Sequence, residues 1–247
     1  MMNAMKFAFS ILTTVPFGFS CKFDDKTWPN SVYFYPLCGY LLALLSAGSF
    51  FAFAKIIYIP DLIQAVGIAT FLFLLTGGMH LDGLADTCDS LFCPASRDKR
   101  IEIMHDSRIG AFGTIGLFFI LATKISALYI LVGTHKYLEI FCAIVIARFM
   151  LVVLIKIGRY FPYEIGMGQE IIGKIPWLTL LVAFIYSAPC IFAGWNTAIT
   201  TLILLGVVLF LNYRANAKLD GISGDILGTA VEICETFGFI LLTLNFH

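Results

Sequence analysis

The chain has 247 residues, of which 60% are hydrophobic and only 13% are charged, and its mean hydropathy is +0.91. Soluble domains carry about 25% charged residues, so this composition excludes a soluble globular protein and indicates an integral membrane protein. The 16 basic and 16 acidic residues cancel. This balance excludes a strongly basic nucleic-acid-binding protein and a disordered acidic tail.

Apolar segments of about 20 residues are long enough to cross a bilayer as helices. The sequence predicts about seven of them, and therefore an all-α, polytopic membrane bundle that forms one catalytic domain over residues 1–247. In chain order the predicted spans are Tyr33–Ile59, Asp61–Gly78, Ile109–Gly133, Tyr137–Ile157, Pro176–Ala193, Thr197–Tyr213 and Asp225–Leu244. The second and sixth are short, so one of them is a candidate re-entrant segment. Phe7–Phe19 is too short to span and is expected to lie at the interface.

The basic residues predict how these spans are oriented. With the N-terminus inside, twelve of the 16 Lys and Arg residues fall on one side of the membrane, which the positive-inside rule makes cytoplasmic. The long loops Met79–Arg108, Gly158–Ile175 and Arg214–Gly224 lie on that side. We therefore expect a multi-pass protein of the cytoplasmic (inner) membrane whose active site faces the cytoplasm.

A first acidic group follows the second predicted span. Asp82, Asp86 and Asp89 are spaced i, i+4 and i+7, so a helix would carry them on one face. Neighbouring carboxylates repel one another, and a divalent cation relieves that repulsion. Ligand sets of oxygen atoms alone favour Mg²⁺, Mn²⁺ or Ca²⁺ over zinc. The alternative is a solvated acidic helix end, and the nearby His80 is a candidate ligand, base or phosphate contact, or an ordinary interfacial histidine.

A second acidic group opens the last predicted span. Asp225, Glu232 and Glu235 share one helix face, and the two glutamates would lie inside the membrane, where carboxylates are functional candidates. Gly224 precedes them in a glycine-rich turn that permits close approach of the backbone to a ligand. The two acidic groups together supply six candidate metal ligands.

Basic side chains near these groups are candidate phosphate contacts. Asp106 or Ser107 can cap the third predicted span, which would put Arg108 near the positive end of that helix. The alternative is an ordinary cap with an arginine that extends toward water. Lys124 and Arg148 lie within spans, so each needs a carboxylate partner or a ligand phosphate.

Phosphoryl transfer requires carboxylates that hold a divalent cation and basic groups that contact the phosphates. The chain offers both, and Lys174 is a further candidate among the basic groups. The chain has no G-x-x-x-x-G-K-[ST] or H-E-x-x-H motif, which argues against a P-loop enzyme and a zinc intramembrane protease. The competing class is a transporter that uses the charges inside the spans as an ion path. Against it, most polar residues lie on one side, and no inverted repeat is visible.

Gly77–Asp89, with the sequence G-G-M-H-L-D-G-L-A-D-T-C-D, resembles the signature of the cobalamin synthase family, the adenosylcobinamide-GDP ribazoletransferases. Ile103–Gly113, Gly166–Ile175 and Gly224–Glu235 agree with that family in order and spacing. The departures are Ser90, where members often have Gly, and His105, where they often have Lys or Arg. A membrane CDP-alcohol phosphotransferase is the nearer alternative, but its fuller D-G-x-x-A-R pattern is missing.

The resemblance implies transfer of phosphoadenosylcobinamide from adenosylcobinamide-GDP to α-ribazole or its 5′-phosphate, with Mg²⁺ as cofactor and GMP as by-product. It also implies a lipid bilayer around the chain, while a homo-oligomer is neither required nor excluded by the sequence. The expected catalytic residues are His80, Asp82, Asp86, Asp89 and Arg108. The expected substrate-binding residues are Asp106, Ser107, Arg148, Lys174 and Gly224. The expected metal ligands are Asp82, Asp86, Asp89, Asp225, Glu232 and Glu235.

Overall fold

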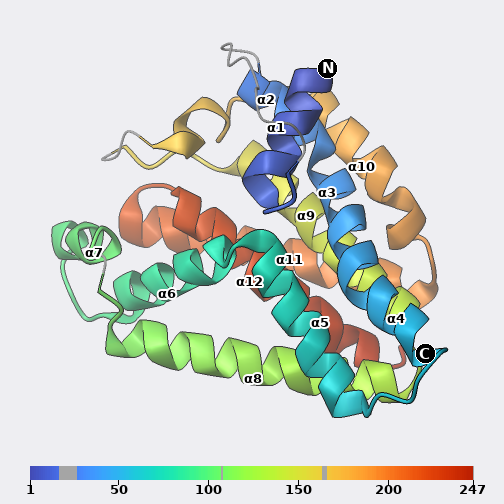
Figure 1. Ribbon diagram of the computed structural model, residues 1–247. Helices are drawn as coiled ribbons and strands as arrows, with labels where there is room; N and C mark the ends of the chain where they lie inside the picture. The colour runs from blue at the N-terminus through green and yellow to red at the C-terminus, as the bar shows by residue number, and fades with distance from the viewer. Residues whose placement is uncertain (17–26, 107, 163–165, 247) are drawn as a thin grey trace.

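The computed structural model describes residues 1–16, 27–106, 108–162 and 166–246, and it arranges them as a bundle of helices (Figure 1). Within these ranges there is no strand, only an isolated bridge between Tyr160 and Ile222. The all-α prediction is therefore confirmed. The elements in chain order are α1 (Met2–Leu12), α2 (Thr27–Ser31), η1 (Val32–Phe34), α3 (Tyr35–Ala43), η2 (Leu44–Gly48), α4 (Ser49–Ala54), α5 (Asp61–Thr76), α6 (Met79–Phe92), α7 (Arg97–Met104), α8 (Ala111–Gly133), α9 (Tyr137–Ile157), η3 (Met167–Glu170), α10 (Trp177–Ile191), α11 (Trp195–Leu219) and α12 (Gly224–Thr243).

Five helical segments of the described chain are long and apolar enough to cross a membrane: the continuous run Thr27–Ala54 and the helices α8, α9, α11 and α12. The pair α5 and α6 forms either a broken sixth span or a re-entrant loop, and α10 is apolar but has only 15 residues. The predicted spans coincide with these elements in order, and the polytopic membrane architecture is confirmed. The prediction that the sixth span is short was wrong, because α11 has 25 residues and continues to Leu219.

The helix α9 forms the centre of the bundle. Every residue from Cys142 to Ile155 is buried, and α3, α10, α11 and α12 pack around it. A helix that is apolar on all sides is stable only when neighbouring elements surround it. The sequence of α9 meets that condition, with Arg148 as its one charged residue in the buried stretch.

A sharp corner joins α5 to α6 and decides where the first acidic group lies. Gly77 and Gly78 both have left-handed backbone angles, with φ of +63° and +73°, a region that residues with a Cβ rarely adopt. The amide of Gly78 donates to the carbonyl of Phe73, a bond typical of helix ends closed by glycine. The axes of α5 and α6 differ by 91°, so α6 runs beside α8 and α12 (Figure 1).

The N-terminal helix α1 has 11 residues, which is too short to cross a membrane, as expected. Beyond it, the backbone amide of Thr14 donates to the carbonyl of Leu75, and its hydroxyl donates to the carbonyl of Leu74. Both carbonyls belong to the last turn of α5, where the helix itself runs out of donors, and that of Leu74 also accepts from the amide of Gly77. The rest of the predicted interfacial segment lies outside the described residues.

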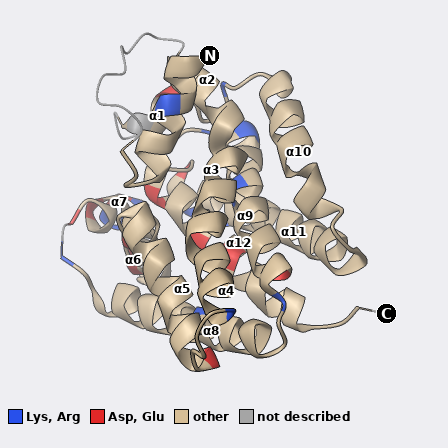
Figure 2. Cartoon of the chain, turned by 45° about the vertical axis from the view of Figure 1, so that its right-hand side comes forward, with Lys and Arg blue, Asp and Glu red and all other residues tan. Residues whose placement is uncertain are grey.

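Charged residues lie at the ends of the bundle and in its interior (Figure 2). At one end Arg97 pairs with Asp220, and Lys218 donates to the carbonyl of Leu91, which ties the α6–α7 and α11–α12 connections together. At the other end Lys136 contacts Asn245 near the C-terminus, at 3.2 Å. Which end faces the cytoplasm stays a prediction.

Candidate active site

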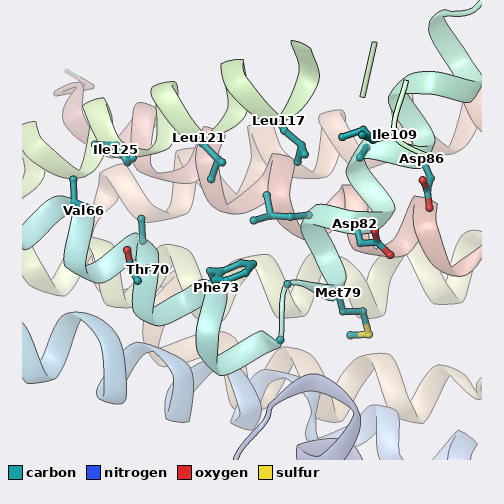
Figure 3. Close-up of a pocket in the computed structure, with 15 residues that line it drawn as sticks. Val66, Thr70, Phe73, Met79, Asp82, Asp86, Ile109, Leu117, Leu121 and Ile125 are labelled. Carbon is teal, nitrogen blue, oxygen red and sulfur yellow. The ribbon is translucent and has the colours of Figure 1, made fainter. Parts of the chain in front are cut away.

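A cavity of about 710 Å³ lies between α5, α6 and α8 (Figure 3). Its walls are mostly apolar, and Asp82 and Asp86 lie together at one end. Val66, Thr70 and Phe73 of α5 and Leu117, Leu121 and Ile125 of α8 are among the residues that line the remainder. The cavity therefore combines a large apolar volume with a pair of carboxylates at one place.

Asp225 joins these two aspartates because α12 packs directly against α6. A Cβ at Gly83 would lie 2.8 Å from the Cα of Asp225, so only glycine permits this approach of the two helices. The negative charges of Asp225, Asp82 and Asp89 all act on Asp86. No ion pair within the described ranges involves Asp82 or Asp86. The site therefore carries concentrated negative charge and would favour a bound cation.

Asp89 has a different role from the other aspartates of α6. It is buried, and its carboxylate accepts hydrogen bonds from the backbone amides of Gly110, at 2.7 Å, and Gly113, at 2.9 Å. These amides belong to the first turn of α8, whose donors have no partner within the helix. Asp89 therefore caps α8 from a neighbouring helix. The expected cap by Asp106 is therefore not observed, and Ser107, the other candidate, lies outside the described residues. The carboxylate of Asp89, expected to bind a metal, accepts from the backbone amides of α8 instead.

Asp106 and Arg108 pair with each other at the protein surface. The guanidinium of Arg108 donates to both carboxylate oxygens of Asp106, at 3.0 and 2.7 Å. These hydrogen bonds, and one from the Arg108 backbone amide, lower the pKa of Asp106 to about 2. Arg108 is exposed and lies two residues before Gly110, the residue that precedes α8. Its guanidinium can therefore reach an anion in solution near the start of that helix.

The charged residues inside the bundle pair with one another. Lys124 of α8 donates to Glu232 at 2.5 Å and to Glu235 at 2.9 Å, and Arg148 of α9 pairs with Glu235. All four side chains are buried. Burial of an unpaired charge is costly, and removing one member of such a group strands the others. Glu232 and Glu235 therefore neutralise interior cations, while their assignment as metal ligands and that of Arg148 as a phosphate contact stay predictions.

Among the described residues, no three His, Cys, Asp or Glu side chains form a group arranged to hold a metal ion. The predicted set of six metal ligands is thus divided between the cavity, the α8 cap and the interior ion pairs. Asp82 and Asp86 remain at the cavity, and Asp225 of α12 acts electrostatically on Asp86 without lining the cavity. One or two protein carboxylates, completed by water and substrate phosphate, are typical of Mg²⁺ sites.

His80 lies away from the carboxylates. It is 2% exposed and lines a second, smaller cavity, whereas Asp82 and Asp86 line the large one. Met79 lines both cavities. Neither nitrogen of the His80 ring has a hydrogen-bond partner within the described part of the chain. Its predicted role as a base at the aspartates therefore has no support from this arrangement.

The two remaining predicted contacts lie at the surface. Gly224 is the exposed first residue of α12, and a Cβ placed there would meet no atom within 4 Å. Lys174 is exposed in the segment that follows η3. Gly224 precedes Asp225 directly and also lines the smaller cavity.

The sequence alone did not reveal the two cavities or the cap on α8. Both depend on contacts between residues far apart in the chain, such as the 21 residues that separate Asp89 from Gly110. One local signal was available, because Gly110 and Gly113 flank the start of an apolar helix without a capping side chain at its first position. A helix start of this kind requires a partner from elsewhere in the protein.

The chain was compared with known proteins. A model of the family described as cobalamin-5-phosphate synthase matches residues 4–243. Among similar proteins, one from Desulforamulus reducens is 33% identical over 99% of this chain and 98% of its own length. One from Escherichia coli is 34% identical over 90% of each chain, and one from Clostridioides difficile is 29% identical over 94% of each.

All three relatives carry the name adenosylcobinamide-GDP ribazoletransferase. No solved structure matches the chain. The family match covers nearly all of the chain, and it includes the α5–α6 corner, the α6 aspartates and the α12 carboxylates. The chain therefore belongs to the cobalamin-5-phosphate synthase family.

Proposed function

We propose that this protein transfers the phosphoadenosylcobinamide group of adenosylcobinamide-GDP to α-ribazole or its 5′-phosphate and releases GMP. The observation that carries this proposal is the pair Asp82 and Asp86 in the wall of a large, mostly apolar cavity, with the charge of Asp225 acting on Asp86. The relatives that match nearly the whole chain are named for the same transfer.

The pair Asp82 and Asp86 fits Mg²⁺, which takes one or two protein carboxylates and completes its shell with water and substrate phosphate. The two carboxylates offer only oxygen atoms, and their mutual repulsion, increased by Asp225, falls when a cation binds. When bound, Mg²⁺ would neutralise negative charge on the diphosphate of the donor substrate. Asp82 and Asp86 are the residues that would hold it, with Asp225 as a further candidate, while Asp89, Glu232 and Glu235 have other partners.

The other residues of the site would act on the two substrates. Arg108 and Lys174 are exposed basic groups that would approach phosphate oxygens and stabilise charge on the departing GMP. A carboxylate of the cavity would accept the proton from the attacking ribose hydroxyl. The apolar walls of the cavity suit a bulky donor, since most of the surface that they present is hydrocarbon.

The transporter alternative loses its main support. Its ion path would use Lys124, Arg148, Glu232 and Glu235, and these four residues are paired with one another in the interior. The carboxylates that remain, Asp82 and Asp86, lie on α6, the helix that leads into the α6–α7 connection. A group-transfer enzyme of the cytoplasmic membrane would need its site at the end that faces the cytoplasm.

The test is product analysis with purified protein in detergent. Incubation with adenosylcobinamide-GDP, α-ribazole and Mg²⁺ should release one GMP for each adenosylcobalamin formed, and chelation of Mg²⁺ should stop the reaction. A parallel reaction with a CDP-activated alcohol donor should release no CMP. Release of CMP without GMP would reject the proposal in favour of a CDP-alcohol phosphotransferase.

A further inference from the structure

The smaller cavity lies on the other side of Met79 from the large one and has a volume of about 100 Å³. Its walls come from several elements that are distant in sequence. Ile11 and Leu12 of α1, Trp28, Tyr35, Leu151 and Ile155 of α9, and Leu227 and Gly228 of α12 are among the residues that line it. The cavity is therefore almost wholly apolar, with aromatic residues in its wall.

His80 and Trp28 supply the exceptions. Both nitrogen atoms of the buried His80 ring, and the indole nitrogen of Trp28, lack a hydrogen-bond partner among the described residues. Burying a polar group without a partner costs about 1–3 kcal/mol, and buried polar groups in proteins are nearly always paired. A neutral imidazole carries one N–H donor and one acceptor. The ring is thus suited to bind a ligand that enters the cavity.

The cavity also adjoins the candidate active site. Met79 lines both cavities, and Gly224, which lines the smaller one, is followed directly by Asp225. A molecule seated here would therefore lie close to the site of the aspartates. This is the position expected of the second substrate in a transfer between two molecules.

We propose that this cavity binds the aromatic base of the acceptor nucleoside, with His80 donating a hydrogen bond to the single free ring nitrogen of its benzimidazole. The proposal rests on the proposed function for the identity of the acceptor. A benzimidazole joined to ribose has one in-plane acceptor and otherwise apolar edges, which suits a mostly apolar slot whose unpaired polar groups are the His80 imidazole and the Trp28 indole N–H. The guanine and adenine of the donor have polar atoms on several edges, which this wall would leave unpaired.

The test is a comparison of two acceptors in the full-length protein. The first is α-ribazole, and the second is an analogue in which the free ring nitrogen is replaced by C–H, which makes the base a dimethylindole. In the unchanged protein the analogue should have a KM about tenfold higher, the ratio expected from one lost hydrogen bond. In His80→Leu the KM for α-ribazole should rise about tenfold, the two acceptors should become equivalent, and the KM for adenosylcobinamide-GDP should stay within twofold.

Thr200→Val is the matched control. Like His80, Thr200 is buried and has a polar group without a partner among the described residues, but it lies on α11 and lines neither cavity. It should leave both KM values within twofold. The proposal is overturned if the unchanged protein does not distinguish the two acceptors, or if His80→Leu keeps the distinction. The first of these comparisons uses the unchanged protein alone. The proposal can therefore be rejected even if His80→Leu folds poorly.

Failure of the proposed function would look different, since the unchanged protein would then release no GMP with either acceptor. In that case equilibrium dialysis with free 5,6-dimethylbenzimidazole and 5,6-dimethylindole decides the matter. Tighter binding of the benzimidazole, lost in His80→Leu, would support the cavity as a base-binding site, and equal binding of the two bases would reject it.

Discussion

Glu235 pairs with both Lys124 and Arg148, whereas Glu232 pairs with Lys124 alone among the cations that the structure describes. The sequence indicated that each of the two interior cations needs a carboxylate partner, and that requirement is met. It did not show which carboxylates would meet it, because these ion pairs join residues 87 to 111 positions apart. Glutamates spaced along one helix face look the same in sequence whether they bind a metal or neutralise a lysine.

The paired arrangement predicts that Glu235→Gln destabilises the protein more than Glu232→Gln. The first change leaves Arg148 buried without a carboxylate, at a cost of about 3–5 kcal/mol, while in the second Lys124 keeps Glu235. Thermal unfolding in detergent, in the absence of divalent cations, measures the difference. If these glutamates were metal ligands, removing their mutual repulsion would instead raise the unfolding temperature of the metal-free protein.

Asp82 is exposed beside the large cavity and takes part in no described ion pair. We expect Asp82→Asn to lower kcat at least 100-fold, about 2.7 kcal/mol, because the amide keeps the size of the side chain but loses the charge that would hold Mg²⁺. The matched control is Asp98→Asn, an exposed aspartate of α7 that should leave the rate unchanged. A rate for Asp82→Asn within tenfold of the original would contradict the metal-binding role.

At the scale of elements, the sequence predicted the spans well because a run of apolar residues is a local property. The predicted Tyr137–Ile157 coincides with α9, and the other spans differ from the observed helices mainly at their ends. The larger error concerns α11, whose last turns contain Arg214, Asn216 and Lys218. There the hydropathy falls while the helical hydrogen bonds continue, so an apolar pattern alone ends the helix too early.

The cap on α8 gives a prediction for that element. Asp89→Ala removes the acceptor for the amides of Gly110 and Gly113 and should cost about 1 kcal/mol of stability. Hydrogen exchange should accelerate in peptides that cover residues 108–116 and stay unchanged in α9. Asp98→Ala again serves as the control. Unchanged exchange at the start of α8, together with weaker Mg²⁺ dependence, would instead favour Asp89 as a metal ligand.

At the scale of the whole molecule, α8 relates the two ends of the bundle. At the first turn of α8, Phe112 contacts Phe92 of α6. At the last residue of α8, Gly133 lies near Asp61, which begins α5. The N-terminal segment and the basic loops lie toward the end where α8 begins, through the contacts of Thr14 with α5 and of Lys218 with α6. The C-terminus lies toward the end where α8 finishes, through the contact of Asn245 with Lys136. The two termini therefore lie at opposite ends of the bundle.

The positive-inside rule then predicts which end faces the cytoplasm, and thiol labelling in cells can test it. Cys93 follows α6 at the basic end, and Gly194→Cys would place a thiol at the α10–α11 connection, where an added Cβ meets no atom within 4 Å. With the other cysteines replaced by serine, a membrane-impermeant maleimide should label position 194 in spheroplasts and Cys93 only in inverted vesicles. Half-buried Cys93 should react fully once the membrane is dissolved, which controls for accessibility. Labelling of Cys93 from the outside would reverse the orientation and move the aspartate cavity away from the cytoplasmic nucleotide that it is proposed to use.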